Sequence, residues 1–369
     1  CPLPPEQGVA ELFLPGEDPL QDHRVQLQKN GLSLENLFVF IDKMLKVYQR
    51  WSYTPLRQRA LQQAEAWIVA HQEESGDWGG IQPAMLNSIL ALHCLGYGNN
   101  HQVIQRGLQA LEFFTLSAGN KLWLQSCISP VWDTALSVRA LAASGLTDTH
   151  PAVAQACQWL LSKQIFARGD WSVKNPYLAS GGWAFEFHNN WYPDVDDSAV
   201  VLMALAEGLT DHNQHRTALD RGIHWCLGMQ SQNGGFAAFD TDNTKAWLNA
   251  SPFADLKALI DPPTEDVTSR VLEMMGLFGY TTEHPIAARA LAYLQSVQQS
   301  DGCWYGRWGV NYIYGTWSVL CGLKAIGEDM ASPYVRRAVS WLMDHQNDDG
   351  GWGETCASYR WPELRGQGP

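Results

Sequence analysis

The sequence predicts an all-α fold in which helix pairs repeat about a centre to form an α/α barrel, with part of a second α/α barrel. One observation behind this is a pattern that occurs five times: an aromatic residue, a Gln five positions later, then a Gly and a second aromatic residue. The other is that the segments flanking each Gly-rich turn carry Ala and Leu at helical spacing and lack strand alternation. Repeated turns between helices therefore predict stacked helix pairs.

The five copies share the same order of residue types, and helices are expected around 64–69, 134–141 and 198–205. The Gln amide is expected to satisfy backbone groups at helix ends and the aromatic ring to cover the turn, which is a structural role and not a catalytic one. The second copy has one extra residue before its Gly, and the third ends in Phe. The copies are Trp67, Gln72, Gly76, Trp78; Trp159, Gln164, Gly169, Trp171; Trp225, Gln230, Gly234, Phe236; Tyr293, Gln298, Gly302, Trp304; and Trp341, Gln346, Gly350, Trp352.

Composition excludes several classes of protein. The formal net charge of -13 argues against a nucleic-acid partner, because phosphate binding needs a basic face. The eight cysteines form no C-x-x-C pair, so neither a zinc ribbon nor a disulfide framework is indicated and a reducing cytoplasm fits best. No apolar run reaches the roughly 18 residues of a spanning helix. The first residue is Cys1 and not Met, which predicts a fragment or a processed chain.

Three acids, Asp194, Asp196 and Asp197, stand immediately before a predicted helix. Alone, such a run is typical of a solvated helix N-cap, but here it lies between the aromatic-rich segment 181–187 and an apolar helix at 199–206. Clustered carboxylates cannot all ionise, so the pKa of at least one is expected to rise, while helix N–H groups stabilise those that stay charged. A neutral, dry and fixed carboxylic acid is what protonation of an alkene requires.

This acid run and the five repeats resemble the D-x-D-D motif and the QW motifs of squalene–hopene-type triterpene cyclases. The resemblance implies an enzyme that protonates squalene and cyclises it to hopene and hopanol without a metal or an organic cofactor. Asp196 is then the proton donor, and Asp194 and Asp197 are its supporting carboxylates. The implied partners are squalene or a related polyprenoid and a membrane surface, bound monotopically at the cytoplasmic face. A homodimer is left open.

Further site residues are carried over on matching segments. Asp133 and Asp266 are implied to hydrogen-bond around the donor. Arg270 stands where the family has a His that polarises the donor; an Arg donates hydrogen bonds but does not give up a proton. Five aromatic residues are implied to stabilise the cyclising cation through their ring faces, although ordinary core packing also fits each, and the third stands where a Tyr is expected. They are Trp132, Phe185, Phe239, Trp308 and Tyr314.

Residues 1–106 are expected to form the C-terminal part of the first barrel, and residues 107–369 the catalytic barrel, incomplete at its C-terminus; the chain alone is expected to be inactive. The segment 34–53 is a candidate membrane or channel helix, with an amphipathic core helix as the alternative.

Two other functions stay open. A noncatalytic interaction module predicts exposed acids and a filled cavity, and a class II cyclase acting on another polyprenoid shares the acid motif. A calcium loop at 240–251 is excluded by Lys245 and Ser251 in place of Gly and Glu, and the Asp, Cys and His zinc cluster of prenyltransferase β subunits is not evident.

Overall fold

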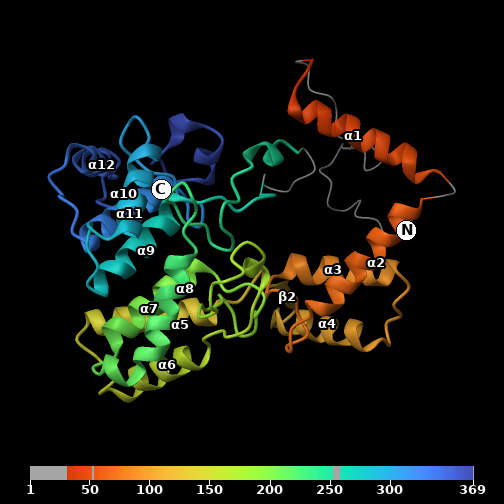
Figure 1. Ribbon diagram of the computed structural model, residues 1–369, viewed down its shortest axis with the longest axis horizontal. Helices are drawn as coiled ribbons and strands as arrows, with labels where there is room; N and C mark the ends of the chain where they lie inside the picture. Colours follow the sequence, from red (N-terminus) through yellow and green to blue (C-terminus); the bar gives the residue numbers. More distant parts are fainter. Residues whose placement is uncertain (1–30, 52–53, 252–257, 369) are drawn as a thin grey trace.

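The computed structural model describes residues 31–51, 54–251 and 258–368, so Cys1 and the end of the segment 34–53 lie outside the described residues. The described chain is mostly helical, as predicted, and its helices form two lobes, α1–α4 and α5–α12 (Figure 1). An antiparallel hairpin of two short strands, β1 (Thr115–Ala118) and β2 (Lys121–Leu124), follows α4.

The lobe that contains the acid run is built from two layers of helices. The inner helices pack side by side in chain order: α5 (Pro130–Ala143), α7 (Val195–Gly208), α9 (Glu265–Leu277) and α11 (Tyr312–Ile326). The outer helices each pack against inner neighbours: α6 (Pro151–Ser162), α8 (Arg216–Gly228), α10 (Pro285–Val297) and α12 (Pro333–Asp344). This alternation of inner and outer helices is the α/α architecture that the repeats predicted.

The core of this lobe centres on α7, which is buried on all sides from Val195 to Leu205. A helix that is apolar all round fits only between two layers of neighbours, and α7 has α5 and α9 beside it and α6 and α8 behind it. The closest approach of the inner helices is between α9 and α11. At Gly322 a Cβ atom would lie 2.4 Å from the carbonyl oxygen of Ser269, so only glycine lets the two backbones touch there.

The Gln residues of the repeats join successive outer helices, which confirms their structural interpretation. Four of them donate from Nε2 to a carbonyl in the first turn of the second α-helix that follows along the chain, each at 2.9 Å. Every such bond fixes the spacing of two helix pairs, and the second Nε2 proton of each amide also bonds to a carbonyl. The pairs are Gln72 with Val103 on α4, Gln164 with Ala218 on α8, Gln230 with Ile286 on α10, and Gln298 with Tyr334 on α12.

The last two residues of a repeat close the turn, as the first copy shows. Gln72 also donates to the carbonyl of Gly76 at 2.9 Å, and the indole Nε1 of Trp78 donates to the carbonyl of Ile68 at 2.7 Å. Ile68 lies near the C-terminus of α2, so the indole satisfies one of the carbonyls that a helix end leaves without an intrahelical partner.

The assignment of the second copy is wrong after Gln164. Its amide donates to the carbonyl of Gly181 at 2.8 Å, and the indole of Trp183 donates to a carbonyl at the end of α6 at 2.7 Å. Gly169 and Trp171, the expected pair, lie instead in an insertion around the short 3₁₀ helix η3 (Asp170–Val173). Gly169 and Trp171 have nearly the expected spacing along the sequence, but Gly181 and Trp183 make the hydrogen bonds that close the turn.

The N-terminal lobe consists of α1 (Leu34–Gln49), α2 (Pro55–Ala70), α3 (Gln82–Cys94) and α4 (Gln102–Phe113). A second hydrophobic cluster holds α3 and α4 together, with Met85, Leu92 and Ile104 at its centre. The boundary near residue 106 stays a prediction; that residue lies within α4.

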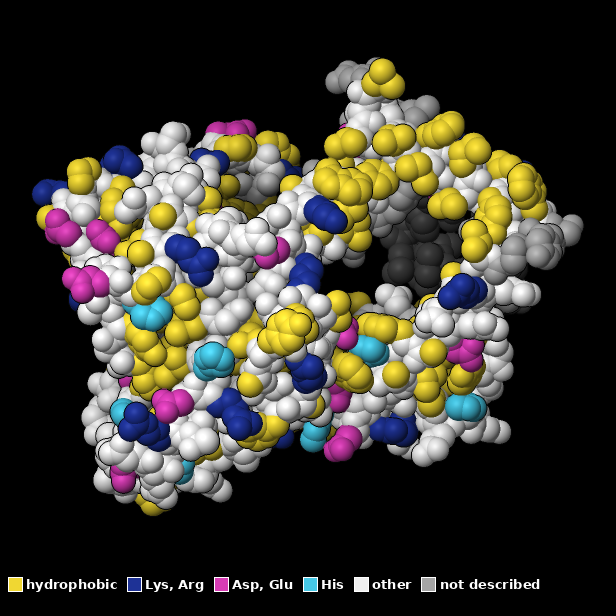
Figure 2. Space-filling view, viewed as in Figure 1, with side chains coloured by type: hydrophobic (Ala, Val, Ile, Leu, Met, Phe, Trp, Pro, Cys, Tyr) yellow, Lys and Arg dark blue, Asp and Glu magenta, His cyan; other side chains and the backbone are white. Residues whose placement is uncertain are grey.

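Helix α1 exposes much of its apolar surface. Its hydrophobic side chains gather along the helix in Figure 2, and they include Phe40, 58% exposed, and Met44, 55% exposed. Helix α1 contacts η5 (Ala246–Ala250) of the other lobe, and there the ring of Phe38 stacks on Trp247 with centroids 6.2 Å apart. None of the described helices is both long enough and apolar enough to cross a membrane.

Candidate active site

The acid run is fixed at the start of α7 by its own backbone contacts. Asp194 is the N-cap in extended conformation; its N–H donates to the carbonyl of Trp183 at 2.9 Å, and its Oδ1 accepts the N–H of Asp197 at 2.7 Å. All three acids are buried, with Asp194 4%, Asp196 8% and Asp197 3% exposed. Exposed acids were the expectation for a noncatalytic interaction module, and that expectation is wrong.

Burial makes these carboxyl groups hard to ionise. It raises the pKa of Asp194 to about 7, although the hydrogen bonds from Asp197 lower it. Burial, and then the charge of Asp194, raise the pKa of Asp197 well above its usual value. Asp197 also has a buried Oδ1 without a hydrogen-bond partner. Two negative charges on Asp194 and Asp197 are therefore unfavourable. Near neutral pH at least one proton stays on this pair of carboxyl groups.

Asp196 faces a different neighbour, the guanidinium of Arg270 on α9. Arg270 Nε donates to Asp196 Oδ1 at 3.1 Å, and Nη2 of the same group donates to the hydroxyl of Tyr314 on α11 at 3.0 Å. Burial raises the pKa of Asp196, and the charge of Arg270 opposes this rise without cancelling it. Burial also raises the pKa of Tyr314, to about 12, so its hydroxyl stays protonated.

The guanidinium of Arg270 is itself held by aromatic rings. Its Cζ lies 5.6 Å from the ring centroid of Trp132 on α5 and 5.8 Å from that of Trp317 on α11. Three inner helices thus orient one cation toward Asp196. Trp317 was not singled out from the sequence, yet it follows Tyr314 by three positions and so shares its helix face, which is the signal that could have identified it.

Asp266 does not hydrogen-bond to Asp196 or to any other member of the acid run. Its Oδ2 accepts the backbone N–H groups of Arg307 and Trp308, both at 2.8 Å, and its Oδ1 accepts the Thr264 hydroxyl at 2.6 Å and the Val267 N–H at 3.0 Å. Four donors from two segments hold this carboxyl group in one position. In this arrangement Asp266 anchors the loop that carries Trp308.

The structure does not bring Asp133 to the acid run. This residue is exposed on α5, and its Oδ2 accepts the hydroxyl of Ser129 at 2.9 Å. Its role around the donor stays a prediction. Phe185 lies half-buried beside the same helix end, where its carbonyl accepts the N–H of Val131 at 3.3 Å.

Aromatic rings line a pocket of about 420 Å³ that is also bordered by Pro193, the residue before Asp194; none of the three acids lines it. The ring of Phe239 meets Trp308 edge-on at 5.9 Å between centroids and Tyr192 at 6.5 Å. Asp261 also lines this pocket and accepts the N–H of Phe239 at 2.9 Å; sequence reasoning did not single it out, although it opens the segment that contains Asp266. Trp308 is 47% exposed, and the guanidinium Cζ of Arg307 lies over its ring, 5.7 Å from the centroid.

Among the described residues, no group of three or more His, Cys, Asp or Glu side chains is arranged to hold a metal ion.

Comparison with known proteins assigns both parts of the chain. The model "Squalene-hopene cyclase C-terminal domain" matches residues 128–369, and "Squalene-hopene cyclase N-terminal domain" matches residues 1–120. A "Squalene--hopene cyclase" of Alicyclobacillus acidocaldarius is 44% identical over 100% of this chain and 57% of its own length. A "Dammaradiene synthase" of Dryopteris crassirhizoma is 42% identical over 99% of this chain and 56% of its own length.

A terpene cyclase–glycosyl transferase fusion protein of Humicola fuscoatra is 43% identical over 90% of this chain and 26% of its own length. The chain therefore spans little more than half the length of the bacterial and fern relatives and about a quarter of the fungal one.

Proposed function

The chain belongs to the squalene–hopene cyclase family, and on that premise we propose that the protein of which it forms part cyclises squalene to hopene and, after capture of water, to hopanol. The observation that carries the proposal is Asp196, a buried carboxylic acid at the start of α7 with a raised pKa and a fixed cationic neighbour. Relatives of this chain include a dammaradiene synthase and a terpene cyclase–glycosyl transferase fusion protein, so the product is tested separately from the proton donor below.

The proposed first step is transfer of a proton from the Asp196 carboxyl to a terminal double bond of squalene. The C–H bond forms with the alkene π electrons, the O–H bond breaks, and the products are a tertiary carbocation and the Asp196 carboxylate. Among the three acids Asp196 is the most exposed, at 8%, which favours it over Asp194 and Asp197 as the one that meets the substrate. Burial raises the pKa of Asp194 and of Asp197, which disfavours the charged form of both neighbouring carboxyl groups.

Arg270 stabilises the carboxylate that this step leaves behind. Its Nε is already within hydrogen-bond distance of Asp196 Oδ1, so no reorganisation is needed as the negative charge develops. The interaction also lowers the pKa of Asp196, which burial more than offsets. Because a guanidinium does not give up its proton, Asp196 must regain a proton from another donor after each turnover.

Aromatic faces around the site are proposed to stabilise the migrating carbocation. Trp132, Phe185, Phe239, Trp308 and Tyr314 are the rings assigned to this role, and a well-placed ring in a dry site contributes on the order of 2 kcal/mol. Phe239, Trp308 and Tyr192 meet edge to face around the pocket, which supports the assignment for that part of the path. Phe239 offers a ring without the hydroxyl of a Tyr, so it contributes through its face alone.

We also propose that the protein lies on the cytoplasmic face of a membrane, where its substrate dissolves. The support is the exposed apolar surface of α1, along which Phe40, Ile41 and Met44 are each more than 40% exposed. Residues 1–106 are proposed to complete the first barrel and residues 107–369 to form the catalytic barrel.

The test is product analysis by mass spectrometry after incubation of the full-length protein with squalene. Hopene and hopanol are expected from the wild type, and Asp196→Asn is expected to abolish both. The matched control is Asp220→Asn, which removes an exposed carboxylate on α8 and should leave the products unchanged. Turnover of Asp196→Asn at the wild-type rate contradicts the donor role, whereas a different cyclic product from the wild type contradicts only the hopene assignment.

A further inference from the structure

A second group of buried acids lies outside the site described above, where the first Gly-rich turn meets the loop before α7. Glu73, Asp77 and Glu186 are 5%, 2% and 4% exposed. Within the described part of the chain none of them forms an ion pair. Two cations nearby bond to backbone carbonyls instead: Lys163 to Phe187 at 3.0 Å, and Arg106 to Glu73 at 2.6 Å.

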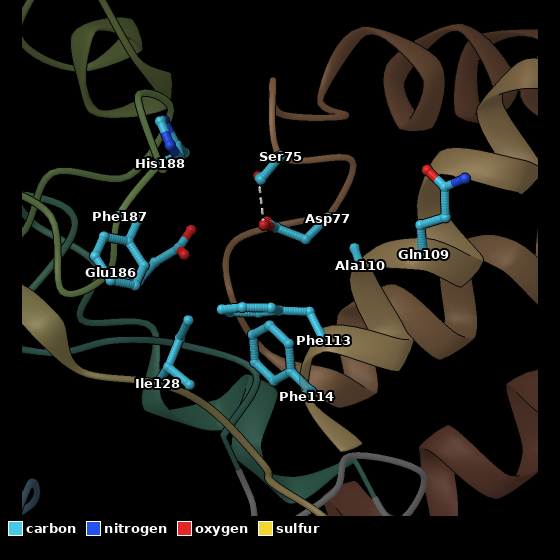
Figure 3. A pocket seen from close by; sticks show the side chains of 10 residues that line it. All are labelled: Ser75, Asp77, Gln109, Ala110, Phe113, Phe114, Ile128, Glu186, Phe187 and His188. Atoms are coloured by element: carbon cyan, nitrogen blue, oxygen red, sulfur yellow. Dashed lines mark hydrogen bonds between the residues drawn. The ribbon is translucent and has the colours of Figure 1, made fainter. Parts of the chain in front are cut away.

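Two of these acids line a pocket of about 330 Å³, shown in Figure 3. The carboxylate of Glu186 points into the space that separates it from Asp77, and its Oε1 is buried without a hydrogen-bond partner. Asp77 is held in place by the hydroxyl of Ser75 at 2.5 Å and the N–H of Gly80 at 3.1 Å. A buried carboxylate oxygen without a donor is costly, so an occupant that supplies one would stabilise the pocket.

The position of Glu186 depends on Gly80. A Cβ atom at Gly80 would lie 2.4 Å from Cδ of Glu186, so the acid side chain occupies the space that a larger residue would fill. The chain at Gly80 also has φ +63, in the region that glycine favours. Two segments more than a hundred residues apart are thus shaped to bring one carboxyl group to the pocket.

The rest of the pocket is mainly aromatic. Phe113 and Phe114, at the end of α4, and Phe187 line it together with Ile128, and Phe113 is 66% exposed. Carboxylates beside phenyl faces form a site that suits one class of ligand, a cation with an apolar body, because the rings attract a cation while the acids accept its N–H groups. A metal ion is a poor match, since no metal-binding group of side chains is found among the described residues.

We propose that this pocket binds a small organic cation, an alkylammonium group whose N–H groups donate to Glu186 and whose carbon chain lies against Phe113 and Phe114. The site is separate from the acid run, and it stands whether or not squalene is the substrate. Burial raises the pKa of Glu73 to about 7 and of Glu186 to about 8. Binding of a cation therefore releases protons near neutral pH and strengthens as pH rises. The exposed His188 also lines the pocket.

The experiment is calorimetric titration of the folded chain with n-butylammonium at pH of about 9, where the amine is still mostly charged. The neutral probe 1-pentanol, which is one non-hydrogen atom longer than n-butylammonium, is the first control. Glu186→Gln is expected to weaken n-butylammonium binding on the order of tenfold. The matched control Glu74→Gln removes a neighbouring exposed acid outside the pocket and should change binding less than about twofold.

A third variant tests the proposal even if Glu186→Gln does not fold. Phe113→Leu alters an exposed ring and so should fold normally; it is expected to weaken n-butylammonium binding several-fold. The proposal is overturned if n-butylammonium does not bind, or if 1-pentanol binds as tightly. It is equally overturned if Glu186→Gln, shown folded by circular dichroism, binds like wild type, or if Glu74→Gln weakens binding as much as Glu186→Gln. Should Glu186→Gln not fold, undiminished binding by Phe113→Leu overturns it.

Discussion

Arg270 on α9 donates a buried hydrogen bond to Asp196 on α7, with Nε 3.1 Å from Oδ1 and side chains only 4% and 11% exposed. The pair combines two opposed requirements of an acid catalyst. Burial holds the proton on Asp196, while the guanidinium stabilises the anion that remains once the proton has left.

Arg270→Gln should slow turnover on the order of 100-fold, because the carboxylate formed on protonation of the alkene loses its charged donor. The same change removes the influence that lowers the pKa of Asp196, so the loss of activity at high pH should move to higher pH. The measurement is the pH dependence of kcat for the full-length protein. Arg216→Gln, which breaks an exposed ion pair with Asp220, is the control. A high-pH limb that stays in place or moves to lower pH contradicts the assignment.

Asp266→Asn should destabilise the chain by about 2–3 kcal/mol, because a charged acceptor of four hydrogen bonds becomes a neutral amide beside the N–H groups of Arg307 and Trp308. Urea unfolding measures the free energy of unfolding. The matched variant is Asp133→Asn, whose exposed carboxylate bonds only to Ser129 and whose loss should cost less than about 0.5 kcal/mol. Equal effects for the two variants would show that Asp266 does not anchor the loop.

Gln298→Ala should cost about 1–3 kcal/mol, since its amide joins the carbonyl of Gly302 to that of Tyr334 on α12. Gln346 occupies the corresponding place in the last repeat but is exposed and donates only to Gly350. Its replacement by Ala should therefore cost less than about 1 kcal/mol. Thermal or urea unfolding of the two variants distinguishes them, and a larger effect at Gln346 would contradict the role of the link between outer helices.

The stability of the chain should fall as pH rises from about 5 to about 8. Glu186 has a pKa raised from 4.5 to about 8 in the folded chain by burial, and Glu73 one raised to about 7. Between the unfolded and folded values the folded state binds more protons, so the free energy of unfolding decreases with pH and levels off above the folded pKa.

Glu186→Gln has no proton to lose at this position and should show a smaller fall, whereas Glu74→Gln should keep the full fall. The measurement is urea unfolding at several pH values. A free energy of unfolding that rises across this pH range in the wild type would contradict the prediction.

The sequence by itself determined the features that depend on residues close together along the chain. Helical periodicity and Gly-rich turns gave the all-α architecture, and the position of Asp194, Asp196 and Asp197 ahead of an apolar stretch identified the start of α7, because capping and periodicity act within a few residues. The family resemblance placed Arg270 near the acids, and the structure pairs it with Asp196.

Only the tertiary structure decided which groups meet across the chain. It gave the second repeat Gly181 and Trp183 as its turn residues, and it turned Asp266 toward the 307–308 backbone and away from Asp196. It also brought Glu186 opposite Asp77. The physical reason is the same in each case: a hydrogen bond or a buried charge depends on the distance between atoms far apart in sequence, and packing sets that distance.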